Sequence, residues 1–356
     1  MRKTVIFLIA LISSAPATQA SEIMDWLDEH AAGIVPMGDR SAPAPADAAT
    51  LLTLENKQNE MYPLPSPDGR YLLAVTWQGK DALISRRFSE NGDPANRVSF
   101  DVRALDSMRW MNNNKVYYLS DRAGGLGLWE KISDGEGMQR RIQRLDGILT
   151  QPVLLADGAI IVVRLKPVSR KAKTKTRRHT KHDDFNNWTF PGFGTEIIRY
   201  DGNGTAHVLS EGVNPSLSPD GKWIAFAMPT GRSMHLFRMR TDGSDLIQIT
   251  DARSVDVQPS WSNDGKSILF TSNRAGIDLR HPNKSGWDIW SIGIDGRNLL
   301  QITFDKARDG AARMGSDGRI YFHSDRGISK ALRAEHQIKS GSSHGYHIWT
   351  ISRPSR

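Results

Sequence analysis

A short turn sequence recurs along this chain at a nearly constant interval, which limits the chain to a repeat fold. The two clearest copies are Asn214–Phe226 (NPSLSPDGKWIAF) and Gln258–Phe270 (QPSWSNDGKSILF). With Asn113-Asn114 taken as one Asp-Gly equivalent, the turns fall at positions 69, 114, 158, 221, 265 and 318, which are 45, 44, 63, 44 and 53 residues apart. A period of this length with insertions predicts the four-stranded blade of a β-propeller. Because Asn adopts positive φ more readily than most residues, we expect Asn113-Asn114 to take the Asp-Gly conformation.

Each repeat contains runs that are rich in β-branched and aromatic residues and bounded by Gly, Asp and Asn, as strands are. A first strand, such as Val257–Ser262, leads into the turn. The second strands are expected at Tyr71–Thr76, Val116–Ser120, Ile160–Arg164, Trp223–Met228, Ser267–Ser272 and Ile320–Ser324. The third strands are expected at Ala82–Arg87, Leu126–Ile132, Glu196–Tyr200, His235–Arg240, Trp287–Ile292 and Tyr346–Ile351. Outer strands are clearest at Leu246–Thr250 and Leu299–Thr303.

The last repeat ends one strand short, because only Ser352–Arg356 follow its third strand. Thr50–Leu54 lies about as far ahead of the first turn as other outer strands lie ahead of theirs, so it is the expected donor. Such an N-terminal strand would close the ring and cover an exposed edge. The sequence therefore predicts an all-β fold over residues 50–356: a six-bladed β-propeller of four-stranded antiparallel blades, the last blade closed by an N-terminal strand.

Several motifs resemble the repeats of TolB-like propellers, which belong to the WD40-like or PD40 repeat family. They are the Ser-Pro-Asp-Gly-Lys turn, the Ser-Asp/Asn-Arg stretches ending at Arg122, Arg274 and Arg326, the Asp-Ile-Trp strand at Asp288, and the Asp-Gly-Ser sequence at Asp242. The resemblance spans residues 50–351 and implies a binding scaffold of the bacterial cell envelope. TolB carries an α/β domain ahead of its propeller, whereas only residues 21–49 precede the first expected strand here. Peptidase-associated propellers and some polysaccharide lyases share similar repeats, so the motifs specify fold more than activity.

The N-terminus has the features of a secretory signal peptide over residues 1–20. Arg2 and Lys3 precede an apolar run from Val5 to Ile12, and small residues lead to a cleavage site after Ala20. The run is about half the length needed to span a bilayer. The chain has no cysteine, which excludes disulfides and a lipid-modified N-terminal cysteine. We therefore expect a soluble monomer in the periplasm, with secretion as the alternative. A short helix and a Pro/Ala linker are expected over residues 21–49.

The basic charge of the chain is local. The net charge is +8 at pH 7, yet eight cations and no acid lie between Lys166 and Lys181. This run opens an insertion at 166–194, between the second and third strands of the third repeat. The fifth and sixth repeats carry further insertions, which include 277–285 and 327–345, between the same two strands. In an antiparallel blade these connections leave from one face, so the insertions are expected to form one binding surface.

We identify ten candidate binding residues in these insertions, chosen as cations or as aromatics that follow the basic run: Lys171, Lys173, Lys175, Arg177, Arg178, Trp188, Phe190, Arg280, Lys284 and Arg333. Cations with exposed aromatics suit an envelope protein, an anionic glycan or a lipid headgroup, and thus peripheral membrane contact. Export argues against nucleic acid. The alternatives are that the basic run is a solvated loop and that the aromatics anchor this loop to the propeller.

The main functional alternative is a lyase-like propeller enzyme that acts on an acidic glycan with Mn²⁺ or Ca²⁺. We favour a scaffold with no catalytic residue, metal or cofactor. His281, His323, His336, His344 and His347 show no metal-ligand spacing and are expected at the surface. Gly341–Gly345 spells a nucleophile elbow outside the required strand-turn-helix context. The recurring residues are ascribed to turn and inter-blade architecture: Asp68, Asp220, Asp264, Asp317, Arg122, Arg274 and Arg326.

Overall fold

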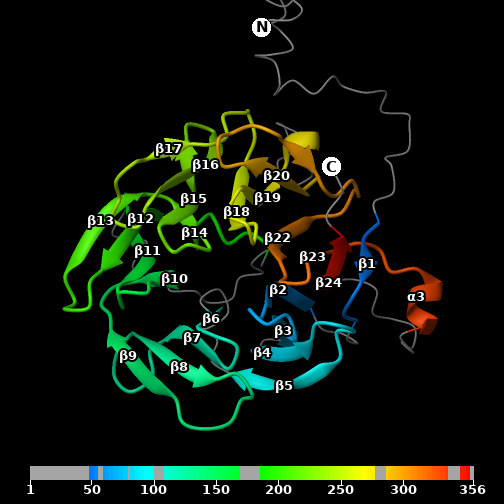
Figure 1. Ribbon diagram of the computed structural model, residues 1–356, viewed down its shortest axis with the longest axis horizontal. Helices are drawn as coiled ribbons and strands as arrows, with labels where there is room; N and C mark the ends of the chain where they lie inside the picture. The colour runs from blue at the N-terminus through cyan, green and yellow to red at the C-terminus, as the bar shows by residue number, and fades with distance from the viewer. Residues whose placement is uncertain are drawn as a thin grey trace, which may run out of the picture. The chain divides into compact units, whose positions relative to one another are not determined.

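The computed structural model describes residues 48–54, 59–78, 81–99, 108–168, 185–276, 286–335 and 345–352. The expected signal peptide, the short helix and nearly all of the linker lie outside these ranges. Within them the structure contains six four-stranded antiparallel sheets. The sheets stand around a common centre, with the first strand of each blade innermost (Figure 1). No helix in the described ranges has the length and apolar character that crossing a bilayer requires.

The blades follow one another in chain order. Blade 1 consists of β2 (Asn59–Pro65), β3 (Tyr71–Gln78), β4 (Asp81–Phe88) and β5 (Pro94–Ser99). Blade 2 consists of β6 (Arg109–Trp110), β7 (Lys115–Ser120), β8 (Gly127–Ile132) and β9 (Arg140–Arg144). Blade 3 consists of β10 (Leu149–Leu154), β11 (Ile160–Pro167), β12 (Phe193–Tyr200) and β13 (Ala206–Glu211).

Blade 4 consists of β14 (Val213–Leu217), β15 (Trp223–Thr230), β16 (Ser233–Arg240) and β17 (Ile247–Gln248). Blade 5 consists of β18 (Asp256–Trp261), β19 (Ser267–Ser272), β20 (Asp288–Gly293) and β21 (Leu300–Gln301), with a 3-10 turn η3 (Arg274–Gly276) after β19. Blade 6 consists of β22 (Asp309–Met314), β23 (Arg319–Ser324), β24 (His347–Ser352) and β1 (Thr50–Leu51), with a short helix α3 (Lys330–Glu335) after β23.

The expected closure of the ring is confirmed. β1 pairs antiparallel with β24, which places Thr50 opposite Thr350 and Leu51 opposite Trp349. Beyond β1 the chain stays attached, because the backbone N–H of Leu52 donates to the carbonyl of Ile348 at 2.9 Å. The second and third strands also lie where the sequence places them, and β19 matches its expected range. The outer strands β17 and β21 are shorter than expected. After Gln248, for example, the hydroxyl of Thr250 accepts the Leu236 N–H in place of a ladder partner.

The Asp-Gly turns are built as the sequence indicates, with one exception. Gly221 has φ of +71°, and Asp220 accepts hydrogen bonds from the hydroxyl of Ser218 and the N–H of Lys222. The expectation that Asn113 or Asn114 takes positive φ is wrong, since neither residue does. The side chain of Asn112 accepts from two backbone N–H groups instead and thereby holds the turn without a left-handed residue.

Tryptophans of the innermost strands join neighbouring blades. The indole N–H of Trp110 donates to the carbonyl of Leu64 in blade 1 at 2.8 Å. Trp261 makes the same bond to Ser216 in blade 4 at 2.9 Å. Apolar clusters fill the space between successive sheets, for instance around Phe226 and Phe237 between blades 3 and 4. These contacts make the six sheets one rigid ring around a central channel.

Candidate functional site at the two ends of the channel

The two ends of the channel differ because of strand connectivity. We call the end that carries the second-to-third strand connections the insertion face, and the end that carries the Asp-Gly turns the turn face. The three long connections, β11–β12, β19–β20 and β23–β24, all leave from the insertion face, as the sequence predicts. The functional groups of this propeller can therefore be assigned to one end or the other.

A ring of left-handed residues marks the middle of the channel. One residue in each of five inner strands has φ near +54° and coincides with a register shift: Tyr62, Gln151, Asn214, Gln258 and Ala311. The equivalent stretch of blade 2 lies outside the described residues. This conformation turns the backbone N–H out of the ladder, so each N–H needs another acceptor.

Side chains of the same ring supply those acceptors. The N–H of Asn214 donates to Gln151 Oε1 at 2.7 Å, and the N–H of Gln258 donates to Asn214 Oδ1 at 3.3 Å. The N–H of Ala311 donates to Gln258 Oε1 at 2.7 Å. Blade 6 has Ala311 at this position, which offers no polar side chain. The N–H of Tyr62 in blade 1 therefore donates to another residue of blade 6, His323, whose Nδ1 lies 3.1 Å away. Among the described residues, these bonds link blades 3, 4, 5, 6 and 1 in succession around the channel.

The end of the blade 3 insertion crosses this ring. Asn187 accepts from the side-chain amides of three blades: Gln151 to its carbonyl at 2.8 Å, and Asn214 and Gln258 to its Oδ1 at 3.1 and 3.0 Å. Gln258 also donates to the carbonyl of Phe185 at 3.4 Å. The segment 185–188 is therefore fixed to the channel wall from several sides. We call this segment the plug.

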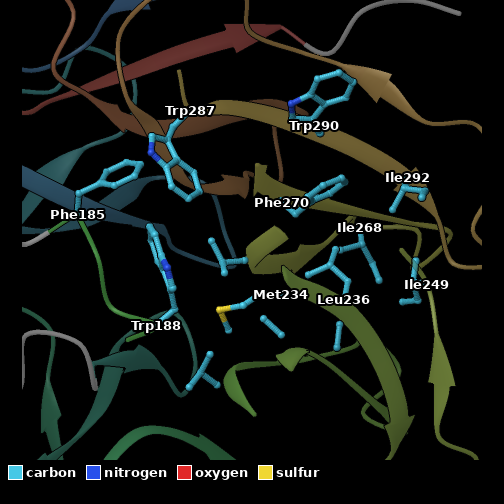
Figure 2. Close-up of a cluster of buried hydrophobic side chains, with 14 of the residues drawn as sticks. Phe185, Trp188, Met234, Leu236, Ile249, Ile268, Phe270, Trp287, Trp290 and Ile292 are labelled. Carbon is cyan, nitrogen blue, oxygen red and sulfur yellow. The ribbon is translucent and has the colours of Figure 1, made fainter. Parts of the chain in front are cut away.

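Aromatic side chains hold the plug at the insertion face. Phe185 is 2% exposed and lies 5.6 Å, between ring centroids, from both Trp188 and Trp287. It also stacks on Tyr346 at 5.8 Å. Figure 2 shows Phe185, Trp188 and Trp287 turned toward one another beside the blade 5 core. The aromatics of this insertion thus come together with residues that begin the third strands of blades 5 and 6.

The aromatics after the basic run were expected to be exposed, but Phe185 and Trp188 are buried. Trp188 is 6% exposed, Phe185 is buried, and Phe190 is partly buried against the same cluster. The anchoring alternative accounts for this placement, because apolar rings leave water where a wall of other rings is available. The proposed binding role of Trp188 and Phe190 stays a prediction.

Two histidines expected at the surface are buried. His323 and His347 are 0% and 2% exposed, because both lie on strands of blade 6 that face the ring junction. Burial, with the charges of Arg308 and Arg313, lowers the pKa of His323 to about 3. His323 is therefore neutral, and since its Nδ1 accepts from Tyr62, its proton is on Nε2. The other three histidines named above lie outside the described residues. Within the described ranges no cluster of three His, Cys, Asp or Glu residues has the spacing of a metal site.

Two of the recurring arginines, Arg274 and Arg326, make ion pairs within their own blade rather than between blades. Arg274 pairs with Asp256 at 2.6 Å, and Arg326 pairs with Asp309 at 2.5 Å. Each guanidinium also lies over the tryptophan of its own third strand, 5.3 Å from the Trp290 ring centroid in blade 5. Both pairs are buried. Each pair joins the start of the first strand of its blade to the segment that follows the second strand.

The remaining candidate binding residues are mostly not described. Lys171, Lys173, Lys175, Arg177, Arg178, Arg280 and Lys284 lie outside the described residues. Arg333 belongs to α3 on the insertion face, where Nε and Nη2 donate to the carbonyl of Ile328 at 3.2 and 2.9 Å. Part of the hydrogen-bonding capacity of this guanidinium is therefore used by the segment that leads into α3.

The turn-face end of the channel opens as a pocket of about 540 Å³. Its wall includes Leu64, Leu154 and Leu217, and the charged residues in it are Arg109 and Arg313. A void of about 30 Å³ continues from these arginines to Asn187 of the plug. Sequence reasoning missed both the ring and this pocket. One signal was present: a proline follows the left-handed residue at positions 63, 152, 215 and 259.

The plug gives a direct prediction. Asn187→Ala should lower the free energy of unfolding by about 1–3 kcal/mol, because the buried side-chain amides of Asn214 and Gln258 would lose the Oδ1 acceptor. Asn91→Ala, which removes an exposed turn hydrogen bond to the Asp93 N–H, should cost less than about 1 kcal/mol. Urea denaturation of both variants checks this. An Asn187 variant as stable as the Asn91 variant would show that the plug is not fixed by these bonds.

These features define a six-bladed β-propeller whose channel is plugged at the insertion face and open at the turn face. Residues 204–279 match the model of the PD40 family, which is described as the TolB beta propeller domain. In sequence the chain is similar to TolB-like propellers. A TolB homolog of Chlorobium luteolum is 35% identical over 223 residues, 60% of this chain and 46% of that protein.

Other comparisons agree. The Tol-Pal system protein TolB of Francisella tularensis is 30% identical over 134 residues, 36% of this chain and 29% of that protein. The chain therefore spans less than half the length of these relatives. A solved structure described as a putative TolB from Agrobacterium tumefaciens has a TM-score of 0.51 at 18% identity, and the match covers 84% of this chain and 91% of that chain. At that identity the structural likeness establishes the fold alone.

Proposed function

We propose that this chain is a periplasmic scaffold of the cell envelope that binds its partner on the insertion face. The observation that carries the proposal is that all three long connections leave from this face, where the plug is hydrogen-bonded to the inner strands of three blades. Insertions gathered on one face of a repeat scaffold form a binding surface. Surfaces of this kind suit a macromolecular partner.

The partner we propose is an envelope protein with an acidic surface, or an anionic glycan or lipid headgroup at the same surface. The support is the run of eight cations without an acid between Lys166 and Lys181, which leads directly into the plug. Because Asn187 ties the plug to three blades, the basic run is attached to the rigid ring at its C-terminal end. The Tol-Pal name of the relatives also supports an envelope protein partner.

The basic run is tested by charge removal. Replacing Lys171, Lys173, Lys175, Arg177 and Arg178 with Gln should weaken partner binding and remove most of its salt dependence, because exposed charges are screened over about 8 Å at physiological ionic strength. Stability should change by less than about 0.5 kcal/mol. Crosslinking in intact cells with mass spectrometry identifies the partner, and titration of purified components at several salt concentrations measures the effect.

A comparison variant controls for loss of charge in general. Lys222 and Lys266 are exposed and belong to Asp-Gly turns on the turn face. Replacing both with Gln should leave binding unchanged, whereas replacing only Lys171 and Lys173 should already weaken it. If the five-residue variant binds as tightly as the parent at every salt concentration, the basic run is a solvated loop and the proposal is wrong.

A further inference from the structure

Two arginines occupy the same rung of the propeller in different blades. In five blades the rung lies two residues after the left-handed residue, and in every blade its member pairs with the second or third residue of the second strand. The members are Leu64, Arg109, Val153, Ser216, Ser260 and Arg313. Four of the six members are uncharged. The two arginines belong to blades 2 and 6, which flank blade 1, so they lie on one side of the channel.

The two guanidinium groups line both the turn-face pocket and the small void behind it. They have matching anchors, since Arg109 Nη1 donates to the carbonyl of Met108 at 2.8 Å and Arg313 Nη1 donates to that of Ala312 at 2.9 Å. A guanidinium has five N–H donors. Of the described carboxylates, none lies within 4 Å of Arg313, and that single hydrogen bond is the one it makes.

The electrostatics of the pair are unfavourable as the channel stands. Burial and the like charge of Arg109 lower the pKa of Arg313 well below its ordinary value, to about 9. Arg313 is still charged at neutral pH, and the described residues of the pocket lining include no acid. The like charges of Arg109 and Arg313 repel each other, and an anion placed between them would relieve that repulsion.

The rest of the pocket restricts what can carry the anion. Leucines of blades 1, 3 and 4 and the ring of Trp110 form most of the wall. Its volume of about 540 Å³ falls in the range of small-molecule sites, roughly 300–1,000 Å³. We propose that the turn-face pocket binds a small oxyanion on an apolar body, with Arg109 and Arg313 holding a carboxylate or phosphate group and the leucines packing against the body.

This site lies at the opposite end of the channel from the proposed partner surface and is independent of it. The probes are octanoate, octyl phosphate and octanol, measured by isothermal titration calorimetry on the full chain. Octanoate or octyl phosphate should bind, and octanol should bind much more weakly. Arg313→Gln and Arg109→Gln should each weaken binding roughly 10–100-fold, since each removes charged hydrogen bonds to the anion. Arg313→Lys should fall between Gln and the parent.

Two controls keep the outcomes separate. The Gln variant of the basic run should bind octanoate like the parent, so loss of partner binding and loss of this site can be told apart. Without ligand, Arg313→Gln should melt at or above the parent temperature, because a repulsive charge is gone. Binding of octanoate alone identifies a carboxylate ligand, and binding of octyl phosphate alone identifies a phosphate ligand. Equal binding of octanol, absence of binding by both anions, or unchanged binding in both Gln variants would overturn the proposal.

Discussion

Removal of residues 21–49 should leave the propeller intact, whereas removal of residues 21–54 should destabilise it strongly. The second deletion takes away β1, so the edge of β24 becomes exposed. It also removes Leu52, which is 6% exposed and packs against Ile348 and Tyr321. Loss of a buried leucine side chain alone costs about 2–5 kcal/mol. The hydroxyl of Thr53, which accepts the Ile348 N–H at 3.1 Å, is lost as well.

Urea denaturation followed by circular dichroism measures both deletions. The longer deletion should lower the free energy of unfolding by more than Leu52→Ala does in the full-length chain, because it removes hydrogen bonds in addition to the side chain. Equal midpoints for the two deletions would show that the last blade does not need its N-terminal strand.

Closure by an N-terminal strand was predictable because its signals are local and repeated. The Asp-Gly turns set the period, and short apolar runs such as Ser267–Ser272 set the strands on either side. A missing outer strand in one repeat then has to come from elsewhere in the chain. Errors arose where a side chain replaced a backbone contact, as Asn112 does in the blade 2 turn.

The arrangement inside the channel was not predictable in the same way. The plug is held by Asn187, whose partners Gln151, Asn214 and Gln258 are 27 to 71 residues away in the sequence. No local pattern indicates that these side chains meet. The same applies to Arg109 and Arg313, whose common rung becomes visible only once the strand registers are known. The sequence alone does not indicate whether the aromatic residues after the basic run are exposed to water or packed against other aromatic side chains.

Glu60→Gln should cost about 3–5 kcal/mol, the range observed when one partner of a buried ion pair is removed. Glu60 is 0% exposed, and its Oε1 lies 2.8 Å from Nη2 of Arg87. Its Oε2 lies 3.4 Å from Nδ1 of His347, which belongs to β24. The group therefore joins blade 1 to blade 6 at the point where the ring closes. In the variant, the buried guanidinium of Arg87 would face a neutral amide.

The same carboxylate should make stability depend on pH. Burial by itself raises the pKa of Glu60, but the hydrogen bond with His347 and the charge of Arg87 outweigh it, so the pKa lies below the ordinary value of 4.5. A depressed pKa means that the stabilisation is complete above the unfolded-state pKa and is lost as the pH falls through the folded-state pKa. The parent should lose stability below about pH 4.5 more steeply than Glu60→Gln does.

Urea denaturation at pH 7 and at several values between about pH 5 and 3 tests both expectations. Glu90→Gln, at an exposed position of the neighbouring β4–β5 turn, is the matched control and should change stability by less than about 0.5 kcal/mol. The double variant Glu60→Gln/Arg87→Met should recover part of the loss, because it removes the unpaired buried charge. If Glu60→Gln is as stable as Glu90→Gln, and follows the parent at every pH, the ring does not depend on this group for its closure.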